Sequence, residues 1–197
     1  MWAKEIMGFE LYYLVGAFVI YSMLGWLVES IYMSFCNKKI TNRGFAKGPF
    51  CPIYGFGAVL GYLILSPLRD NVVQLYLAGA FLATAFEYLV GIAMIHFLGE
   101  LWWDYNKKPF NYKGIICLES TIAWGFYAVG IVCFLHFKVC WLLDRVDRLA
   151  AIRGINLVLT IAAIDYIIQL TKVLHIDMQA KKDKLIEKYQ SFKARWY

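Results

Sequence analysis

Residues 71–99 read NVVQLYLAGAFLATAFEYLVGIAMIHFLG and contain one charged side chain, Glu87, in 29 positions. About 20 consecutive apolar residues suffice to cross the hydrocarbon core of a bilayer as an α-helix. The stretch therefore predicts a membrane-spanning helix over residues 72–98. Sixteen uncharged residues precede Glu87 and 12 follow it, so this helix also carries a deeply placed acid.

The rest of the chain has the same character. Of its 197 residues 61% are hydrophobic and 17% are charged, whereas about a quarter of a soluble domain is charged, so a soluble protein is excluded. We predict an all-α integral membrane bundle of five transmembrane helices, at about residues 10–34, 50–68, 72–98, 115–137 and 154–174. The five scattered cysteines predict free thiols, not disulfides or a zinc site.

Lys and Arg residues predict the orientation. The side that holds residues 36–49, residues 99–114 and the C-terminal tail carries 14 of them, and the opposite side carries 6. Because basic residues concentrate in cytoplasmic loops, we expect the N-terminus outside and the C-terminus in the cytoplasm. Residues 1–175 would then form a single transmembrane domain, and residues 176–197 a cytoplasmic helical tail.

The tail is predicted to continue the fifth helix as a basic, amphipathic helix. Met178, Leu185, Tyr189, Phe192 and Trp196 recur at intervals of seven, four, three and four residues, which places them on one helical face. Such a helix lies on anionic lipid or docks a cytoplasmic partner, and the sequence leaves both interpretations open.

A weak repeat relates the first two spans to the next two. A shift of 70 residues places YGFGAV (54–59) on WGFYAV (124–129), and the first span of each unit carries a carboxylate, Glu29 or Glu87. Two parallel helical hairpins related by an axis along the membrane normal would give this pattern, a plan that some transporters use. Short matches in apolar sequence also arise by chance, so duplication and coincidence both stay open.

Four acids lie inside the predicted spans: Glu29, Glu87, Glu119 and Asp165. A charge at the centre of a spanning helix costs about 2.5–3.5 kcal/mol on insertion scales, so each acid is a functional candidate. Glu29 and Glu119 are close enough to polar loops to reach the membrane surface instead, and Asp165 has Lys172 or a neighbouring hydroxyl as an alternative partner. Glu87 is the deepest of the four.

Small residues accompany these acids. Ser22 and Gly25 share a helical stripe with Glu29, and Gly57 and Gly61 lie four residues apart in the second span. Small side chains let membrane helices approach closely and shield a charge from lipid, so both stripes are expected at helix–helix contacts.

The two polar loops are predicted to meet. The first passes through NRGFAKGPFCPIYGFG (42–57) into an apolar segment, and the second covers residues 99–120. Their prolines and glycines leave backbone groups unpaired, which is tolerated only where protein or water covers them. We therefore expect the loops to form the rim of a polar pocket open to the cytoplasm, with Arg43 close to Asp104 and the deep acids as the floor.

Five segments together resemble a known motif series: GWLVES (25–30), NRGFAKGPFCPIYG (42–55), EYLVG (87–91), LWWDY (101–105), and NYKGIICL followed by WG (111–118 and 124–125). They are similar to the family described as putative ABC-transporter type IV, also called CmpB-like. The resemblance implies a small permease-like protein of the bacterial inner membrane. Its polar motif positions, which become candidate substrate-binding residues, are Glu29, Asn42, Arg43, Cys51, Tyr54, Glu87, Asp104 and Asn111. Glu119 departs from the family pattern.

These features favour a permease-like protein that binds a small solute or cation in the polar pocket. A second reading is an intramembrane enzyme acting on a lipid or lipid-linked substrate, with Cys51 as its nucleophile, although neither motif loop holds a histidine to activate it. A third is a regulatory subunit whose tail docks a cytoplasmic partner. The chain has no Gly-x-x-x-x-Gly-Lys-Ser/Thr loop and cannot hydrolyse ATP alone. We expect a lipid bilayer around it, and no cofactor, metal site or nucleic-acid partner.

Overall fold

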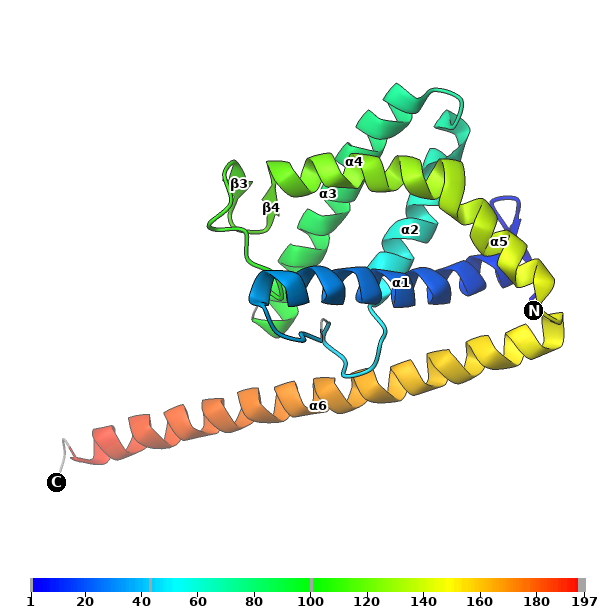
Figure 1. Ribbon diagram of the computed structural model, residues 1–197. Coiled ribbons are helices and arrows are strands. Elements are labelled where there is room, and N and C mark those ends of the chain that lie inside the picture. Colours follow the sequence, from blue (N-terminus) through cyan, green and yellow to red (C-terminus); the bar gives the residue numbers. More distant parts are fainter. Residues whose placement is uncertain (1, 43, 100, 195–197) are drawn as a thin grey trace.

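The computed structural model describes residues 2–42, 44–99 and 101–194, and beyond residue 172 it describes the helical backbone but not the side chains. The helices are α1 (Leu11–Asn37), α2 (Pro52–Leu65), α3 (Val72–Leu98), α4 (Leu118–Gly130), α5 (His136–Arg145) and α6 (Arg148–Ala194). Short turns complete them, the 3-10 turn η1 (Ser66–Leu68) after α2 and the π-helical turn η2 (Ile131–Leu135) between α4 and α5. Two antiparallel hairpins pair β1 (Glu5–Ile6) with β2 (Phe9–Glu10) and β3 (Asn111–Tyr112) with β4 (Ile116–Cys117). The protein is an all-α membrane bundle, as predicted (Figure 1).

Among the described residues, four segments are long and apolar enough to span a bilayer: Leu11–Asn37, Val72–Leu98, Leu118–Arg145 and Arg148–Lys172. They correspond to the first, third, fourth and fifth predicted spans. The second predicted span, residues 50–68, is the shorter apolar helix Pro52–Leu68. At about 1.5 Å per residue this helix reaches about 25 Å, less than the roughly 30 Å of a hydrocarbon core.

Local sequence explains where the helices begin and end. The side-chain oxygen of Asn71 accepts a hydrogen bond from the Gln74 backbone N–H at 3.1 Å and caps the start of α3. Gly99 ends α3 in the left-handed conformation with a φ of 74°, which glycine adopts without a steric penalty. Pro52 lies in the first turn of α2, where a backbone N–H has no helical partner. The Asn71 cap and the left-handed Gly99 thus bound α3 at the predicted residues 72–98.

Two helical hairpins, α1 with α2 and α3 with α4, make the closest helix contacts. A Cβ atom on Gly55 of α2 would lie 2.2 Å from Ser22 Oγ of α1, and one on Gly79 of α3 would lie 2.2 Å from Ala128 Cβ of α4. The helices therefore approach through small residues, which is typical of membrane proteins.

The close helix–helix contact predicted at Gly57 and Gly61 is wrong, because other residues of the same helix make it. Gly61 has no atom within 4 Å of the position that its Cβ would take, and Gly57 makes only an ordinary contact with Phe86 at 3.6 Å. Gly55 lies two residues before Gly57 and so about 200° around the helix. The glycine pattern therefore identified the helix that packs closely but not the face that it uses.

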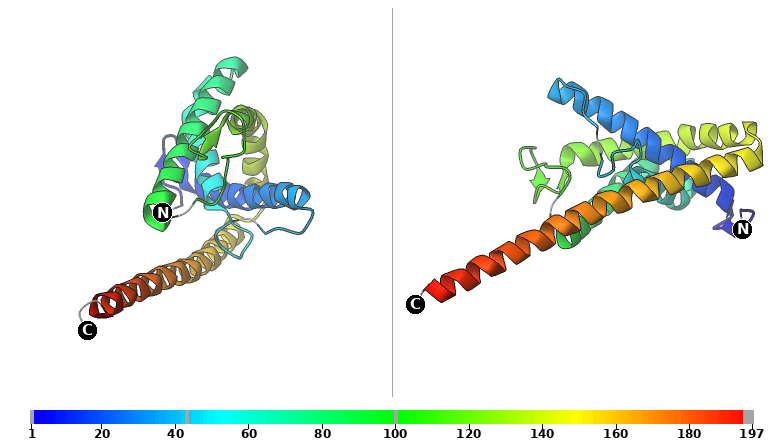
Figure 2. Two further views of the ribbon diagram at one scale, coloured as in Figure 1. Left: turned by 90° about the vertical axis from the view of Figure 1, so that its left-hand side faces the viewer. Right: turned by 90° about the horizontal axis from the view of Figure 1, so that it is seen from below.

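The larger core cluster joins α1, α2, α5 and α6. Its buried members include Tyr12, Ala17 and Tyr21 of α1, Val139 of α5 and Ile155 of α6. Figures 1 and 2 show α6 running past α1 and the first polar loop and then projecting beyond the bundle. The helix continues to Ala194, so the predicted extension of the fifth helix is confirmed. The apolar stripe expected between residues 178 and 196 lies outside the described side chains.

Candidate functional site

Glu87 lies in α3 and is only 6% exposed. Three neutral groups donate hydrogen bonds to its carboxylate: Tyr105 Oη to Oε1 at 3.0 Å, Ser120 Oγ to Oε2 at 3.2 Å, and Trp124 Nε1 to Oε2 at 3.0 Å. Within the described part of the chain, no Lys or Arg forms an ion pair with Glu87. The hydrogen bonds satisfy the polar atoms, but no described cation compensates a negative charge there.

Glu29 of α1 is joined to Tyr54 of α2. The Tyr54 hydroxyl donates a hydrogen bond to Glu29 Oε2 at 2.9 Å. Gly25, one helical turn before the acid, lets the ring approach, because a Cβ atom at this position would lie 2.3 Å from Tyr54 Cγ. Two of the predicted site residues are thus brought together by the α1–α2 hairpin.

The two acids belong to one group of side chains. The ring centroids of Tyr54 and Trp124 lie 6.4 Å apart, so the donor to Glu29 and the donor to Glu87 are neighbours. The following residues are referred to below as the acid cluster: Glu29, Tyr54, Glu87, Tyr105, Ser120 and Trp124.

Positions 54 and 124 are equivalent under the 70-residue shift, and each donates a hydrogen bond to an acid, although the shift does not place Glu29 on Glu87. In each hairpin the second helix supplies an aromatic donor to the acid of the first helix. The residue after each donor is a glycine in close contact: a Cβ atom on Gly55 would meet Ser22, and one on Gly125 would lie 2.5 Å from the Tyr76 ring. The shift thus matches the donors and the glycines, but neither the acids nor the residues that the glycines contact.

Tyr105 reaches the acid cluster from the second polar loop. Burial, followed by the Glu87 carboxylate and more weakly by Glu29, raises the pKa of the Tyr105 hydroxyl well above its ordinary value of 10.0. The hydroxyl therefore keeps its proton at physiological pH and remains a donor to Glu87.

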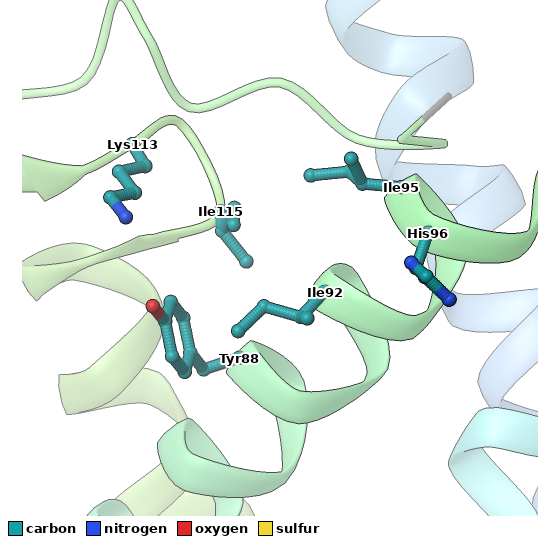
Figure 3. Close-up of a pocket in the computed structure, with 6 residues that line it drawn as sticks. All are labelled: Tyr88, Ile92, Ile95, His96, Lys113 and Ile115. Carbon is teal, nitrogen blue, oxygen red and sulfur yellow. The ribbon is translucent and has the colours of Figure 1, made fainter. Parts of the chain in front are cut away.

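An open groove of about 530 Å³ lies between α3 and the β3–β4 hairpin (Figure 3). Its lining consists of Tyr88, Ile92, Ile95, His96, Lys113 and Ile115. None of the eight predicted site residues and none of the acid cluster is among them. The groove is therefore a feature separate from the acid cluster.

Asn42 holds the first polar loop in shape. Trp26 Nε1 donates a hydrogen bond to Asn42 Oδ1 at 2.6 Å, and Asn42 Nδ2 donates to the Lys47 carbonyl at 2.8 Å. Both sides of the amide are thus used within α1 and the loop itself. Arg43 and its predicted contact with Asp104 lie outside the described residues.

Asp165 ties the same loop to α6. Its Oδ2 accepts a hydrogen bond from the Gly48 N–H at 2.7 Å, and its Oδ1 accepts one from Gln169 at 3.3 Å. The alternative partner considered from the sequence, Lys172, forms no described ion pair with it. Asp165 therefore positions a loop backbone, a role that helical spacing within α6 does not reveal.

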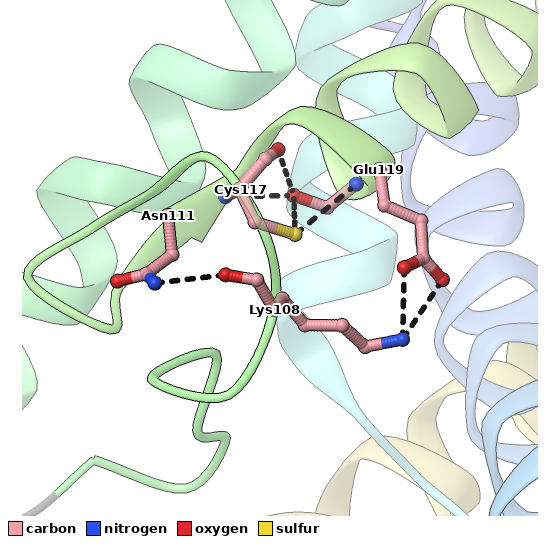
Figure 4. Close-up of polar contacts among 5 residues, drawn as sticks. Lys108, Asn111, Cys117 and Glu119 are labelled. Carbon is pink, nitrogen blue, oxygen red and sulfur yellow. Dashed lines mark hydrogen bonds and ion pairs between the residues drawn. The ribbon is translucent and has the colours of Figure 1, made fainter.

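Asp104 and Asn111 serve the second loop in a similar way. Asp104 Oδ1 accepts hydrogen bonds from the Asn106 backbone N–H at 2.8 Å and from its side-chain amide at 2.6 Å. Asn111 Nδ2 donates to the Lys108 carbonyl at 2.8 Å (Figure 4), and Asn111 Oδ1 accepts from the Gly114 N–H at 3.1 Å. Both predicted side chains thus satisfy the backbone and side chains of their own loop, as such residues commonly do in turns.

Neither Glu119 nor Cys51 belongs to the acid cluster, although the Cys51 carbonyl accepts a hydrogen bond from the Tyr54 backbone N–H at 3.2 Å. Glu119 is exposed and pairs with Lys108 Nζ at 2.8 Å (Figure 4), a contact that raises the pKa of the lysine. Cys51 is 6% exposed and precedes α2, and its backbone N–H donates a hydrogen bond to the Ser22 carbonyl at 3.0 Å. The structure thus places Glu119 at the surface and Cys51 at a buried joint between α1 and α2.

The predicted meeting of the two polar loops is confirmed, and aromatic rings make the described contact. Phe45 of the first loop stacks on Trp102 of the second with centroids 4.8 Å apart and ring planes 9° from parallel. Phe45 also contacts Tyr166 of α6 at 5.6 Å. The loops are therefore fixed to each other and to α6 through one phenylalanine.

Three members of the acid cluster were not among the predicted site residues: Tyr105, Ser120 and Trp124. Trp124 could have been found, because the 70-residue shift places it on Tyr54. Tyr105 belongs to the aromatic run LWWDY, which is typical of a membrane interface. Ser120 gives no signal in the sequence.

The comparisons with known proteins agree with this architecture. No curated protein and no solved structure matches the chain. The family model described as Putative ABC-transporter type IV matches residues 16–170, a range that includes both polar loops and the whole acid cluster. The match covers well over half of the chain and extends beyond both ends of the motif series in residues 25–125. The protein therefore belongs to the putative ABC-transporter type IV family, a transport-related family of multi-pass membrane proteins.

Proposed function

We propose that the protein is a permease-like membrane component that binds a small solute or cation at the acid cluster, in a pocket open to the cytoplasm. The observation that carries this proposal is the environment of Glu87, a buried carboxyl group in a membrane helix. Among the described residues, all the groups that donate hydrogen bonds to it are neutral. Buried acids in spanning helices commonly mark ion or substrate pathways.

Three neutral hydrogen bonds orient the Glu87 carboxyl group but leave its charge without a described counter-charge. A proton or a bound cation would supply the missing positive charge. Glu29, joined through the contact between Tyr54 and Trp124, offers a second carboxylate to the same ligand. A site with two acids and several hydroxyl or indole donors suits a small polar cation better than an anion, because like charges repel.

The other predicted site residues take supporting parts in this proposal. Asn42, Asp104 and Asn111 hold the two loops that border the cluster, and Cys51 forms the joint at the start of α2. Arg43 is proposed to lie on the rim of the pocket, where its positively charged side chain would select among substrates by charge.

The proposed location is the bacterial inner membrane, with the N-terminus outside and the C-terminus in the cytoplasm. The excess of Lys and Arg on one side supports this orientation. In it, residues 1–175 form the transmembrane domain and residues 176–197 form a cytoplasmic tail.

A second function, regulation or assembly through a cytoplasmic partner, is supported by α6. This helix extends to Ala194 and projects beyond the bundle (Figure 2), which gives a partner or anionic lipid an accessible basic helix. The enzyme alternative gains less support, because Cys51 is buried. Of the histidines with described side chains, His96 lies in the groove beside α3 and His136 stacks on Tyr62, so neither is placed to activate Cys51.

Transport in reconstituted vesicles tests the proposal. Wild type, Glu87→Gln and Glu119→Gln would be inserted into liposomes that contain a pH-sensitive dye, with gradients of protons, sodium or potassium imposed. Wild type and Glu119→Gln should show the same ion-dependent flux, and Glu87→Gln should lose it, since only Glu87 belongs to the buried cluster. Equal flux through all three proteins would refute the role given to Glu87.

A further inference from the structure

The donors of the acid cluster are mainly aromatic rings. Tyr105 and Trp124 each donate their polar hydrogen to Glu87, at 3.0 Å in both cases. Tyr54 donates its hydroxyl hydrogen to Glu29 at 2.9 Å. A hydrogen bond from an aromatic group to a carboxylate moves negative charge toward the ring, and the face of such a ring attracts a cation more strongly. Three rings of this kind lie beside the two acids.

A fourth ring, that of Tyr127 on α4, extends the aromatic group. The centroid of the Trp124 ring lies 5.7 Å from that of Tyr127 and 6.4 Å from that of Tyr54, with ring planes inclined at 50° and 46°. Rings stacked flat cover each other's faces, whereas rings inclined at these angles leave parts of their faces uncovered by one another. Tyr127 is 51% exposed and Trp124 is only partly buried. A ligand can therefore reach this group of rings.

Glu87 combines a charge with little remaining capacity to accept hydrogen bonds. An ionised carboxylate has about four lone-pair sites, and Tyr105, Ser120 and Trp124 donate to three of them. Among the described residues, no Lys or Arg forms an ion pair with Glu87. A ligand that compensates this charge therefore needs to be positive but does not need to donate several hydrogen bonds.

These surroundings distinguish between classes of cation. A hard metal cation needs a shell of several oxygen lone pairs, but the groups around Glu87 direct N–H and O–H hydrogens toward it, and the Trp124 indole is a donor only. A primary ammonium group brings three N–H donors and would find about one open site on this carboxylate. A quaternary ammonium group has no N–H, and the faces of aromatic rings are its usual partners in proteins.

We propose that the acid cluster binds a quaternary ammonium group, which lies against the faces of Tyr54, Trp124 and Tyr127 with Glu87 as its counter-ion. The inference rests on the proposed function, because it specifies which cation the acid cluster takes. The substrate class is a small solute with a permanently charged, N-methylated head group.

Thermal unfolding of the purified full-length protein in detergent tests the ligand class, with tetramethylammonium chloride as the probe and sodium and potassium chloride as matched salts. Tetramethylammonium should stabilise wild type at concentrations roughly tenfold lower than either metal ion requires, and Glu87→Gln should lose this effect. Sodium or potassium ions that stabilise wild type as well as tetramethylammonium does would overturn the inference. If Glu87→Gln removes that stabilisation, the proposed cation site still stands. Stabilisation by none of the three salts would also overturn the inference, and proton flux in vesicles then decides the proposed function separately.

Two substitutions at Trp124 isolate the contribution of the aromatic face. Trp124→Phe and Trp124→Leu both lose the N–H donor to Glu87, but only Trp124→Phe keeps a ring. Trp124→Leu should bind tetramethylammonium roughly tenfold more weakly than Trp124→Phe, as expected for the loss of a desolvated cation–π contact. Equal affinities of the two variants would overturn the proposal.

Trp141→Leu is the matched control, because Trp141 is 56% exposed on α5, has Arg145 over its ring and is not a member of the acid cluster. It should bind tetramethylammonium as wild type does. A loss as large as that of Trp124→Leu would overturn the proposal, because the probe would then bind exposed tryptophan in general.

Tyr127 allows the same comparison if the Trp124 variants do not fold. It is not among the described donors to Glu29 or Glu87, so its substitution leaves their hydrogen bonds in place. Tyr127→Leu should weaken the binding of tetramethylammonium, and Tyr127→Phe, which keeps the ring, should not. Equal binding by Tyr127→Leu and Tyr127→Phe would contradict the part given to the ring faces.

Discussion

Glu87 is held by donors that carry no charge, and this arrangement sets how the acid cluster responds to change. A hydrogen bond to a charged group contributes about 1.5–3 kcal/mol, and a buried acceptor left without its donor costs about as much. Of the three donors to Glu87 in the described part of the chain, Tyr105 comes from a loop, whereas Ser120 and Trp124 belong to α4. The loop is therefore tied to α3 through the carboxyl group.

Tyr105→Phe should destabilise the protein by about 1–3 kcal/mol at neutral pH, because it leaves Glu87 Oε1 without that donor. Since the pKa of Tyr105 is raised in the folded protein, its contribution is complete below the unfolded value near 10 and is lost as the pH rises above it. The variant should therefore lose less stability than wild type between roughly pH 9 and pH 12. Thermal unfolding in detergent across this range measures both effects, and parallel losses in the two proteins would contradict the role of Tyr105.

For single residues, the sequence identifies the buried acids better than the side chains that donate hydrogen bonds to them. Glu87 was predicted to be deep because 28 uncharged residues surround it, and Tyr54 was a candidate through the motif series. The donor Tyr105 was not, because aromatic residues near a span end are usually interfacial. Asn42, Asp104 and Asn111 were correctly placed in polar loops, but their hydrogen bonds to loop groups depend on turn geometry that spacing does not specify.

Individual helices are shaped by small residues and by one irregular turn. The π-helical turn η2 precedes His136, which is buried and stacks on Tyr62 with centroids 3.5 Å apart. His136 Nδ1 also lies 3.3 Å from Tyr21 Oη, at hydrogen-bonding distance. A π-helical turn changes the angular register of the residues that follow it. The turn is therefore in a position to direct His136 toward α1 and α2.

Gly25→Ala should destabilise the α1–α2 hairpin by about 1–3 kcal/mol, the usual effect of overpacking. Its Cβ atom would lie 2.3–2.6 Å from Tyr54 atoms that include Cβ and Cγ, which cannot move without displacing α2. Gly61→Ala is the control, since nothing lies within 4 Å of that position, and it should stabilise the protein by up to about 1 kcal/mol through helix propensity. Thermal midpoints of both variants measure the difference, and a stabilising Gly25→Ala would contradict the close contact.

Helix positions were largely predictable, because long uncharged stretches and end signals such as Asn71 and Gly99 are local properties of the chain. The shorter length of α2 and the π-helical turn were not. Both depend on how neighbouring helices pack. The same reason explains why Gly55, and not the predicted pair Gly57 and Gly61, makes the tight contact with α1.

The whole molecule consists of two helical hairpins, each joining an acid to an aromatic donor, and a long helix that crosses them. Asp165 and Tyr166 connect α6 to the first polar loop, through the Gly48 N–H and the Phe45 ring. Phe45 in turn stacks on Trp102 of the second loop. A movement of α6 would therefore reach both loops that border the acid cluster.

The topology has a direct test in single-cysteine labelling with a membrane-impermeant reagent. Cysteines introduced at residues 38–47 and 104–113 should react from the cytoplasmic side, and those at residues 144–153 should react from outside. This pattern follows from the concentration of basic residues on one side. Reaction of both motif loops from outside would reverse the proposed orientation.

Ligand-dependent stability of Glu87→Gln tests the central claim, that the acid cluster binds a proton or cation through Glu87. Thermal unfolding of wild type, Glu87→Gln and the exposed control Glu119→Gln would be followed across pH and with increasing concentrations of candidate cations. Wild type and Glu119→Gln should gain about 2.7 kcal/mol at a ligand concentration of roughly 100 Kd. Glu87→Gln keeps the shape of the side chain and an acceptor oxygen for Ser120 and Trp124, and its amide nitrogen can donate to the Tyr105 hydroxyl. It should therefore fold and insert but gain nothing. Identical curves for wild type and Glu87→Gln would contradict the account and leave Glu87 as a packing residue.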